Sequence, residues 1–512
     1  MEGAAQPTPD GERFVYLPCH SVARSRHSRI PQLDNTSAVP TELLCEILRL
    51  AKDAWPCPSG PPHQTAHRQN AALLRMTSVC SRWRSVSIAS GTLWSNIAFV
   101  TSQLSTVECA ELFLARSKGS MLSVYISDHG KSFTVSQYVE DVIRKVVNAS
   151  ERIKICELSS YSAAFWSRWI QPTPNIRRLV VGGRNMANVG RFGAELAGLR
   201  NVTSFSCGLW PLGESRCLTS VEIRNDDQPV SLSTFLDALR GCETLESLVL
   251  HGFNTFLVSD TPPAVVSLPN LRRLNLFSCD STVLLARIVL SGLSEPLMIF
   301  NPNPHEDILR SLPKCHHHAK FLRNLGKLQV VLNARRSQYS VAAYRADGRL
   351  ALYIGASDVA HWLRWGWVTA SLDAVACFPP FSTVDSLSFA TDSLLTSWDL
   401  WLPHLRHLRY LNVTCPGPDK LLCALLTPDA NTGLPMCRAL RSLALHRCEH
   451  RTLINYAHLK RLVLWRWATQ SPLEEIILHE DEWAYMRYLD MSWVDLVGSQ
   501  STFLSSEVSA HC

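Results

Sequence analysis

The residue types that most often carry chemistry gather at one place, the run Cys315-His316-His317-His318. Thiolates and imidazoles are the ligands that zinc prefers, and structural zinc sites usually draw pairs of them from separate segments. Consecutive histidines point in different directions, however, and no second ligand cluster occurs at a standard spacing. The sequence therefore predicts no metal site, and stoichiometric zinc in the purified protein would contradict this.

Motifs of enzymatic catalysis are missing as well. No Gly-x-Ser-x-Gly, His-Glu-x-x-His or Gly-x-Gly-x-x-Gly occurs, so the signatures of several large enzyme classes are absent. Gly130-Lys131-Ser132 resembles the end of a phosphate-binding loop, but Tyr125 stands where that loop needs its first glycine. We expect a protein that is not an enzyme and has no cofactor, and whose function depends on binding surfaces.

Composition restricts the partners that such surfaces could take. Apolar residues make up 46% and charged residues 18% of the 512 positions, which is typical of folded chains rather than disordered ones. The net charge of +6 is spread along the chain, whereas nucleic-acid binding usually needs a concentrated basic face. No apolar run is long enough to cross a membrane. We therefore expect neither nucleic acid nor membrane among the partners.

Cysteine usage indicates the compartment. The 17 cysteines are scattered and odd in number, and none forms a Cys-x-x-Cys pair. The stretch from Met1 to Gly11 is polar and lacks the apolar core of a signal peptide. We expect a reducing environment, the cytoplasm or the nucleus, in which most cysteines act as small core residues.

The elements that would position a binding surface begin after residue 35. Residues 1–35 are rich in Pro, Ser and Arg and are predicted to form a disordered tail. A helix is then expected from Pro40, which suits a first turn, to Trp55-Pro56, which ends it. Its apolar residues recur on one face: Leu43, Leu44, Ile47, Leu48 and Ala51.

A second helical pattern follows an irregular linker that spans roughly residues 56–69. It starts near Asn70, and Met76, Val79, Trp83 and Val86 form a stripe at helical spacing until Ser90-Gly91 interrupts it. A short helix near 107–117 and a strand at 122–126 are predicted next.

From about residue 150 a short unit recurs in which an apolar residue is followed, three and five positions later, by two more. Several successive copies start 23 to 27 residues apart, the period of leucine-rich repeats. The copies begin at Ile153, Ile176, Leu218, Leu245, Leu271, Val384, Leu408, Leu440, Leu459 and Leu473. A single copy could arise by chance in a leucine-rich chain, but ten at a partly regular period favour a repeat array.

Two features qualify the array. Cys279 and Cys448 follow the last apolar position of their copies by three residues, where such repeats use a side chain to bond neighbouring backbone. Between about 280 and 380 the pattern is weak, so an inserted subdomain is possible there. The tryptophan-rich stretch 361–367 could be a binding hot spot, although packing between repeats is the more usual use of tryptophan.

The segment from Val39 to Phe99 resembles the F-box. The family's opening block corresponds to residues 39–44, its Val-Cys-basic-x-Trp core to residues 79–83 and its closing Leu-Trp to Leu93-Trp94. Val39 replaces the usual leucine, and the linker after the first helix is longer than in the compact form. With a degenerate repeat body behind it, the chain is similar to the expanded F-box families of mushroom-forming fungi.

The resemblance implies a fold and a function. The fold would be α+β overall, with a three-helix F-box over residues 36–100 and an α/β leucine-rich-repeat solenoid over residues 101–512. The chain would be the substrate receptor of an SCF-type ubiquitin ligase, bound to an SKP-type adaptor and through it to a cullin. Matched residues that would contact the adaptor are Pro40, Leu44, Ile47, Leu48, Val79, Cys80, Arg82 and Trp83. Trp94 is expected mainly to hold the helices together.

The repeat body would bind an unknown protein substrate with residues that lie between the core leucines. The candidates, several of them basic, are Arg272, Arg273, Asn275, Arg406, His407, Arg409, Asn412, Arg441, Ser442 and Ala444. The basic residues favour an acidic or phosphorylated target, although arginine is also an ordinary choice for a position that faces solvent. The alternative function is a repeat scaffold that binds the adaptor without a role in ubiquitination, and the sequence does not separate the two.

Overall fold

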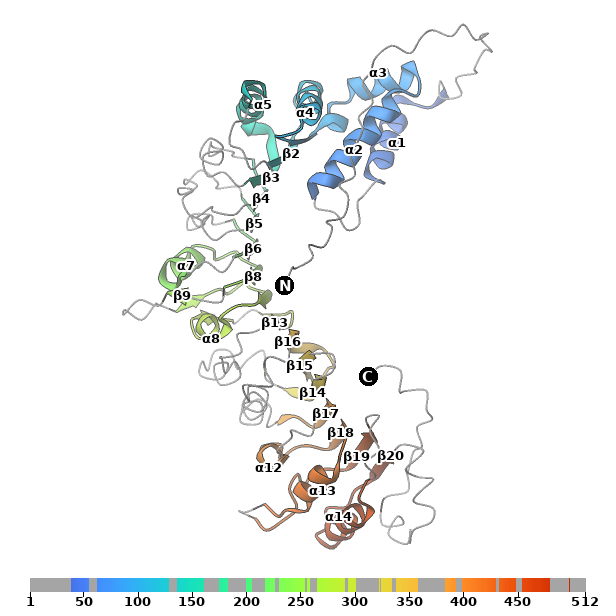
Figure 1. Ribbon diagram of the computed structural model, residues 1–512, viewed down its shortest axis with the longest axis vertical. Coiled ribbons are helices and arrows are strands. Elements are labelled where there is room, and N and C mark those ends of the chain that lie inside the picture. The colour runs from blue at the N-terminus through green and yellow to red at the C-terminus, as the bar shows by residue number, and fades with distance from the viewer. Residues whose placement is uncertain are drawn as a thin grey trace, which may run out of the picture. The chain divides into compact units, whose positions relative to one another are not determined.

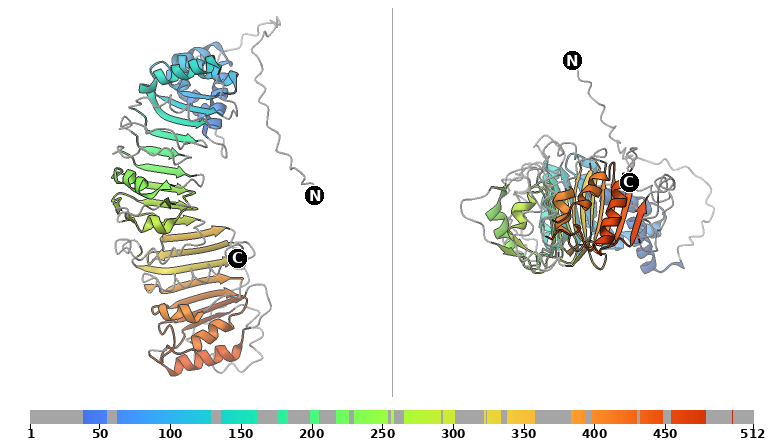
Figure 2. Two further views of the ribbon diagram at one scale, coloured as in Figure 1. Left: turned by 60° about the vertical axis from the view of Figure 1, so that its left-hand side comes forward. Right: turned by 90° about the horizontal axis from the view of Figure 1, so that it is seen from below.

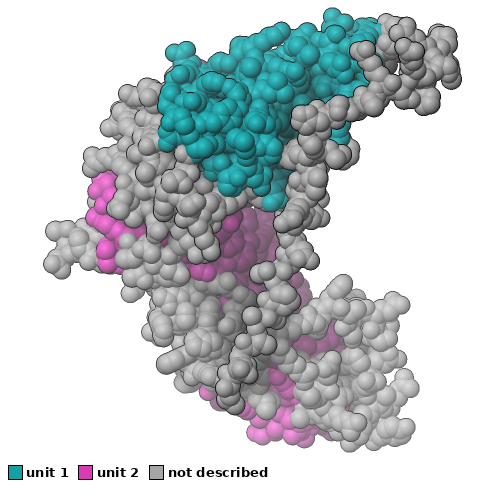
Figure 3. Space-filling model, turned by 45° about the horizontal axis from the view of Figure 1, so that its top comes forward, with its two compact units in different colours: residues 1–162 teal, residues 163–512 magenta. Residues whose placement is uncertain are grey.

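The computed structural model describes residues 38–54, 62–128, 136–160, 175–182, 199–204, 217–225, 230–253, 256–257, 265–290, 293–300, 322, 324–333, 338–357, 383–392, 398–429, 432–447, 454–478 and 497. Several predicted features lie outside these residues: the tail 1–35, Trp55-Pro56, Gly130-Lys131-Ser132, the Val181 side chain, Cys315 to His318, the stretch 361–367 and Cys448. The chain divides into two compact units, residues 1–162 and residues 163–512 (Figure 3).

The first unit opens with three helices, α1 (Thr41–Asp53), α2 (Pro62–Thr77) and α3 (Ser81–Ala89). A 3-10 turn (Gly91–Trp94) leads into β1 (Asn96–Val100), α4 (Leu104–Arg116), β2 (Leu122–Asp128), α5 (Gln137–Asn148), a second 3-10 turn (Ser150–Arg152) and β3 (Ile153–Ser160). Strands β1, β2 and β3 pair in parallel. The predicted end of the F-box domain, residue 100, is the last residue of β1 within this unit.

The stripe predicted as one helix from Asn70 is divided between α2 and α3. Helix α2 starts at Pro62, earlier than predicted, and ends at Thr77. Helix α3 starts afresh because Cys80, in an extended conformation, caps it: its Sγ accepts a hydrogen bond from the Trp83 N–H at 3.5 Å. Val79 therefore lies in the turn between two helices.

The second unit is built on one sheet (Figures 1 and 2). Its strands lie in the order β4 (Arg178–Gly182), β5 (Asn201–Ser204), β6 (Ser220–Arg224), β8 (Ser247–His251), β11 (Arg273–Phe277), β13 (Leu297–Phe300), β16 (Leu350–Ser357), β15 (Gln338–Arg345), β14 (Leu325–Asn333), β17 (Ser386–Thr391), β18 (Tyr410–Cys415), β19 (Ser442–Arg447) and β20 (Glu475–Leu478). Two minor parallel pairs also form, β7 (Val230–Ser231) with β9 (Phe256–Leu257) and β10 (Val266–Ser267) with β12 (Ile288–Val289).

The predicted apolar units become rows of core side chains across this sheet. Leu248, for example, is in register with Val221 on one side and Leu274 on the other, and all three are fully buried. Because side chains alternate along a strand, the two apolar positions that are two residues apart face the same core. The mixed helical and parallel-rich fold predicted from the repeats is thus confirmed.

Short helices lie between strands of this unit: α7 (Leu232–Arg240), α8 (Ser281–Leu285), α12 (Trp398–Trp401) with a 3-10 turn (Leu402–His404), α13 (Asp419–Leu426) and α14 (Tyr456–Ala468). The copy predicted to begin at Leu459 is wrong as a strand, because it forms part of α14. Asn455 caps this helix by accepting from the backbone of Ala457 and His458, and the i, i+3 spacing of Leu459 and Leu462 fits a helix equally well.

The weak region after residue 280 holds an antiparallel insertion. Strand β14 pairs antiparallel with β15, and β15 pairs antiparallel with β16. The outer two then pair in parallel with regular neighbours, β16 with β13 and β14 with β17. A three-stranded meander restores the strand direction, so the parallel sheet continues on both sides of it.

Candidate docking surface

Helix α1 exposes a row of large apolar side chains. Leu43, Ile47 and Leu50 have 57%, 45% and 53% of their surface accessible. Their spacing of four and three residues places them on one face of the helix, and we call them the α1 stripe. Such a contiguous apolar face on a helix is a typical surface for another protein chain.

The structure places two of the predicted adaptor-contacting residues elsewhere. Leu44 and Leu48 are 1% and 0% exposed, and lie in the core of the first unit. Each adjoins a stripe residue in sequence but points about 100° away around the helix, onto the side covered by α2 and α3. Of the predicted residues on α1, only Ile47 belongs to the exposed face.

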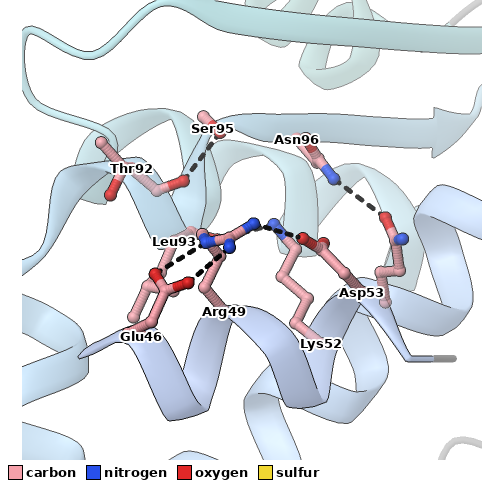
Figure 4. Close-up of polar contacts among 9 residues, drawn as sticks. Glu46, Arg49, Lys52, Asp53, Thr92, Leu93, Ser95 and Asn96 are labelled. Carbon is pink, nitrogen blue, oxygen red and sulfur yellow. Dashed lines mark hydrogen bonds and ion pairs between the residues drawn. The ribbon is translucent and has the colours of Figure 1, made fainter. Parts of the chain in front are cut away.

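A row of charges lies on the same helix as the stripe (Figure 4). Arg49 Nε donates to Glu46 at 2.9 Å, and Arg49 Nη1 donates to Asp53 at 3.2 Å. The hydrogen bond from Arg49 holds the pKa of Glu46 below its ordinary value. Because these side chains are exposed, their ion pairs add little to the stability of the helix.

Lys52 lies on the opposite, buried side of α1. It is 4% exposed, and its Nζ donates to the Leu93 carbonyl at 3.0 Å (Figure 4). Burial lowers the pKa of this amine to about 8. The lysine thereby joins α1 to the turn that carries the predicted Leu93-Trp94 block.

The start of α3 contributes the remaining predicted residues. Val79 is 63% exposed in the turn, and the guanidinium of Arg82 donates to the Val39 carbonyl just before α1. Pro40 is exposed, whereas Cys80 is partly buried as the cap of α3. Trp83 is also partly buried, and its indole Nε1 has no hydrogen-bond partner.

Trp94 has the structural role predicted for it. It is fully buried, its Nε1 donates to the Ser87 carbonyl at 2.6 Å, and its ring meets that of Phe113 edge-on at 4.8 Å. The guanidinium of Arg116 lies 4.4 Å from the ring centroid. This residue thus ties α3 to α4.

The predicted substrate-face residues fall into two groups in the second unit. One lies at β11, and the other lies around β18 and β19; β13, β16, β15, β14 and β17 separate them. The exposed members are Arg272, Arg273, Arg406, His407, Arg409, Asn412 and Arg441. Asn275 is partly buried, while Ser442 and Ala444 are buried.

Two of the arginines that favour an acidic target are paired with carboxylates of the same chain. Arg273 lies 3.4 Å from Glu295, and Arg441 lies 2.9 Å from Glu474. The basic side chains are therefore partly neutralised by carboxylates of the same chain.

Sequence reasoning missed a row of rings on the strand face opposite the leucine core. His251 stacks on Phe277 at 4.3 Å between ring centroids, Phe277 stacks on Phe300 at 4.6 Å, and Phe300 meets Tyr353 at 5.3 Å. The signal was present, since His251, Phe277 and Phe300 each follow directly after a core position. We call these four residues the aromatic row.

The described part of the chain contains no cluster of three or more potential metal ligands. Buried thiols there are poorly suited to nucleophilic chemistry, because burial raises the pKa of Cys242 to about 11 and that of Cys156 to about 12. Cys279 donates to the carbonyls of Leu250 and Phe277, as predicted for its repeat position. Among the described helices, none is long and apolar enough to span a membrane.

The similarity of this chain to known proteins is distant. No model of a known protein family matches the chain, and no curated protein matches it. Among solved structures, it is similar to a leucine-rich-repeat protein of Leptospira interrogans. That similarity has 11% identity and a TM-score of 0.17, over 67% of this chain and 96% of the other. The elements described above define a protein of mixed helices and strands with a large, mostly parallel sheet.

Proposed function

We propose that this chain is the substrate receptor of an SCF-type ubiquitin ligase. Helices α1 to α3 act as the F-box and bind an SKP-type adaptor, which connects to a cullin, and the second unit holds a protein target. The chain itself catalyses nothing. It works in the cytoplasm or the nucleus, without nucleic acid or membrane.

The α1 stripe is the observation that carries this proposal. Leu43, Ile47 and Leu50 expose apolar surface that water solvates poorly, and covering it with another chain recovers that free energy. The resemblance of residues 39–99 to the F-box supplies the kind of partner. We include in the proposed surface Arg82, whose guanidinium donates to the Val39 carbonyl just before α1, and the exposed Val79 in the turn before α3.

The second unit contributes by position rather than by reaction. Its sheet presents side chains on a face that its own leucine core does not use, as repeat proteins do when they bind partners. Holding a target's lysines close to an activated ubiquitin raises their effective concentration. No acid, base or nucleophile of this chain is required for that.

Adaptor binding by the purified full chain tests the proposal. The double variant Ile47→Asp, Leu50→Asp puts two charges into the proposed interface and should weaken binding about 100-fold or more, as loss of two central anchors does. The control is Leu104→Asp on α4, which is 54% exposed in the same unit but outside the stripe. Calorimetry with a purified SKP-type adaptor gives both affinities, and equal binding by all three proteins would contradict the assignment.

Co-purification with a cullin then separates ligase from scaffold. Recovery of adaptor and cullin together, dependent on Ile47 and Leu50, is the expected result. Recovery of the adaptor alone would instead favour the repeat scaffold without a role in ubiquitination.

A further inference from the structure

The aromatic row and the polar residue beside it form an arrangement that the general role of a repeat body does not explain. His251, Phe277 and Phe300 are in register across β8, β11 and β13. Their rings are nearly parallel, with interplanar angles of 8° and 3°. Stacked in this way the rings cover one another's faces, and their edges remain for contact with something else.

Tyr353 completes the row although its own strand position is not in register with Phe300. The strand position in register with Phe300 is Gly355, which has no side chain. A Cβ at Gly355 would lie 2.6 Å from Tyr353 Cε1, so the tyrosine ring occupies the space that a residue there would need. On β16 the ring of the row therefore comes from Tyr353, two residues before the register position Gly355.

The charges at one end of the row are balanced within the chain. Arg224, in register with His251, donates to Glu222 at 3.0 Å, and the same carboxylate lies 3.7 Å from His251 Nε2. Burial, and then the Arg224 guanidinium, lower the pKa of His251, which disfavours the charged form of its ring. Arg273 is paired with Glu295. A ligand for this surface needs no net charge.

Asn275 supplies a second, independent observation. It lies two residues before Phe277 on the same face of β11, between the register partners Val249 and Met298. Its Oδ1 is buried and has no hydrogen-bond partner. The Asn275 side chain as a whole is only partly buried, so a rotation of its amide brings Oδ1 to the surface. An unsatisfied acceptor between apolar neighbours calls for a donor, and a peptide N–H is a donor that an asparagine amide pairs with well.

We propose that the outer face of β8, β11, β13 and β16 binds an uncharged peptide segment. Its apolar side chains lie along the edges of the aromatic row, and one of its backbone N–H groups donates to Asn275 Oδ1 once the Asn275 amide has turned outward. Stacking ligands such as nucleobases fit less well, because they need exposed ring faces and the faces of Phe277 are covered on both sides. That the peptide belongs to the protein target rests on the proposed function.

Selection from a displayed library of random peptides on the full chain provides the probe. Enriched peptides should be rich in aromatic and aliphatic residues and poor in charged ones. Their affinity, measured by fluorescence anisotropy, should fall about tenfold or more in Phe300→Ser and in Asn275→Leu, as expected for central contacts. The control Tyr410→Ser removes a 51%-exposed ring from β18, away from the row, and should bind like the unaltered chain.

Asn275→Leu removes an unsatisfied group and should leave the fold intact. If Phe300→Ser does not fold, the peptide affinity of the Asn275→Leu variant tests the proposal by itself. No enrichment, enrichment of acidic or basic peptides, or equal binding by the Asn275→Leu variant would overturn the proposal. The Ile47→Asp, Leu50→Asp variant should keep full peptide affinity, so loss of adaptor binding and loss of peptide binding are distinguished.

Discussion

Two buried cations illustrate how single residues of this chain are held. Lys52 on α1 and Arg466 on α14 both turn their charge toward backbone carbonyls in the interior. Burial of a cation favours its neutral form, so the pKa falls to about 8 for Lys52 and to about 10 for Arg466. In both cases the hydrogen bonds offset only part of the desolvation cost.

For Lys52 this predicts a pH-dependent stability. The unfolded chain binds this proton more tightly than the folded one, so stability should rise as pH increases from about 8 to about 10.5. Below pH 8 the penalty is complete, at most about 3 kcal/mol. Lys52→Met should therefore stabilise α1 at pH 7 and lose that advantage near pH 10.5. Amide hydrogen exchange of α1 in the full chain measures this, with exposed Lys154→Met as control. A difference that is the same at both pH values would refute it.

Arg466 has a structural role with a larger expected effect. Its side chain is fully buried, and the guanidinium donates to the carbonyls of Met436, Cys437, Arg438 and Leu440 at 2.9 to 3.3 Å. Arg466→Met would remove these hydrogen bonds, although the Cys437 carbonyl also accepts from the Leu440 N–H, and should lower the free energy of unfolding by about 3 kcal/mol. Arg466→Lys should recover little, because one ammonium cannot reproduce a planar fork. Urea unfolding compares the three proteins, and a loss below about 1 kcal/mol would contradict this role.

At the scale of elements, strand ends are fixed by close backbone approaches. Gly252 follows β8 with φ of +73°, and a Cβ there would lie 1.9 Å from the Asn225 carbonyl oxygen. Gly348 lies between β15 and β16 with a similar φ of +79°, but has open space around it. Comparing Gly252 with Gly348 therefore distinguishes the effect of a steric contact from the effect of a positive φ.

Alanine at these two glycines should therefore have unequal effects. Gly348→Ala should cost about 1 kcal/mol, the left-handed penalty alone. Gly252→Ala should cost about 3 kcal/mol or more, since β6 and β8 must also move apart. Thermal unfolding of the full-length variants gives the comparison, and equal costs would show that the Asn225 contact can relax freely.

At the scale of the second unit, β15 joins two stretches of parallel sheet. Its core residue Val341 is fully buried and is in register with Ile354 of β16 and Val330 of β14. Strand β20 lies instead at the end of the sheet and pairs with β19. The two strands present similar core residues in different surroundings.

A buried aspartate should therefore have different effects in β15 and in β20. Val341→Asp should increase amide exchange in β13 and β17, the strands beyond both neighbours of β15, whereas Ile476→Asp should affect mainly β19. Both variants bury an unpaired charge. The number of strands that exchange faster depends on how many strands pair with the substituted one. Equal effects of the two variants would argue against a joining role for β15.

The sequence alone determined the features that depend on local periodicity. The helix after Pro40, the strand at 122–126 and the core positions of most repeat copies follow from spacings of a few residues, and the structure has them. Local spacing cannot tell which side of an apolar helix is covered. The resemblance to the F-box predicts Leu44 and Leu48 as adaptor contacts, whereas α2 and α3 bury them and Leu43, Ile47 and Leu50 stay exposed.

Other features arose only from contacts between residues distant in sequence. The copy at Leu459 became helical because its i, i+3 spacing suits either element, and only the packing of α14 decides between them. The reversed order of β14 to β16, the pairing of Arg273 with Glu295 and the aromatic row each join residues from different strands. Local patterns fix what a segment can form, whereas the free energy of packing, summed over the assembled unit, fixes which of its faces is left for a partner.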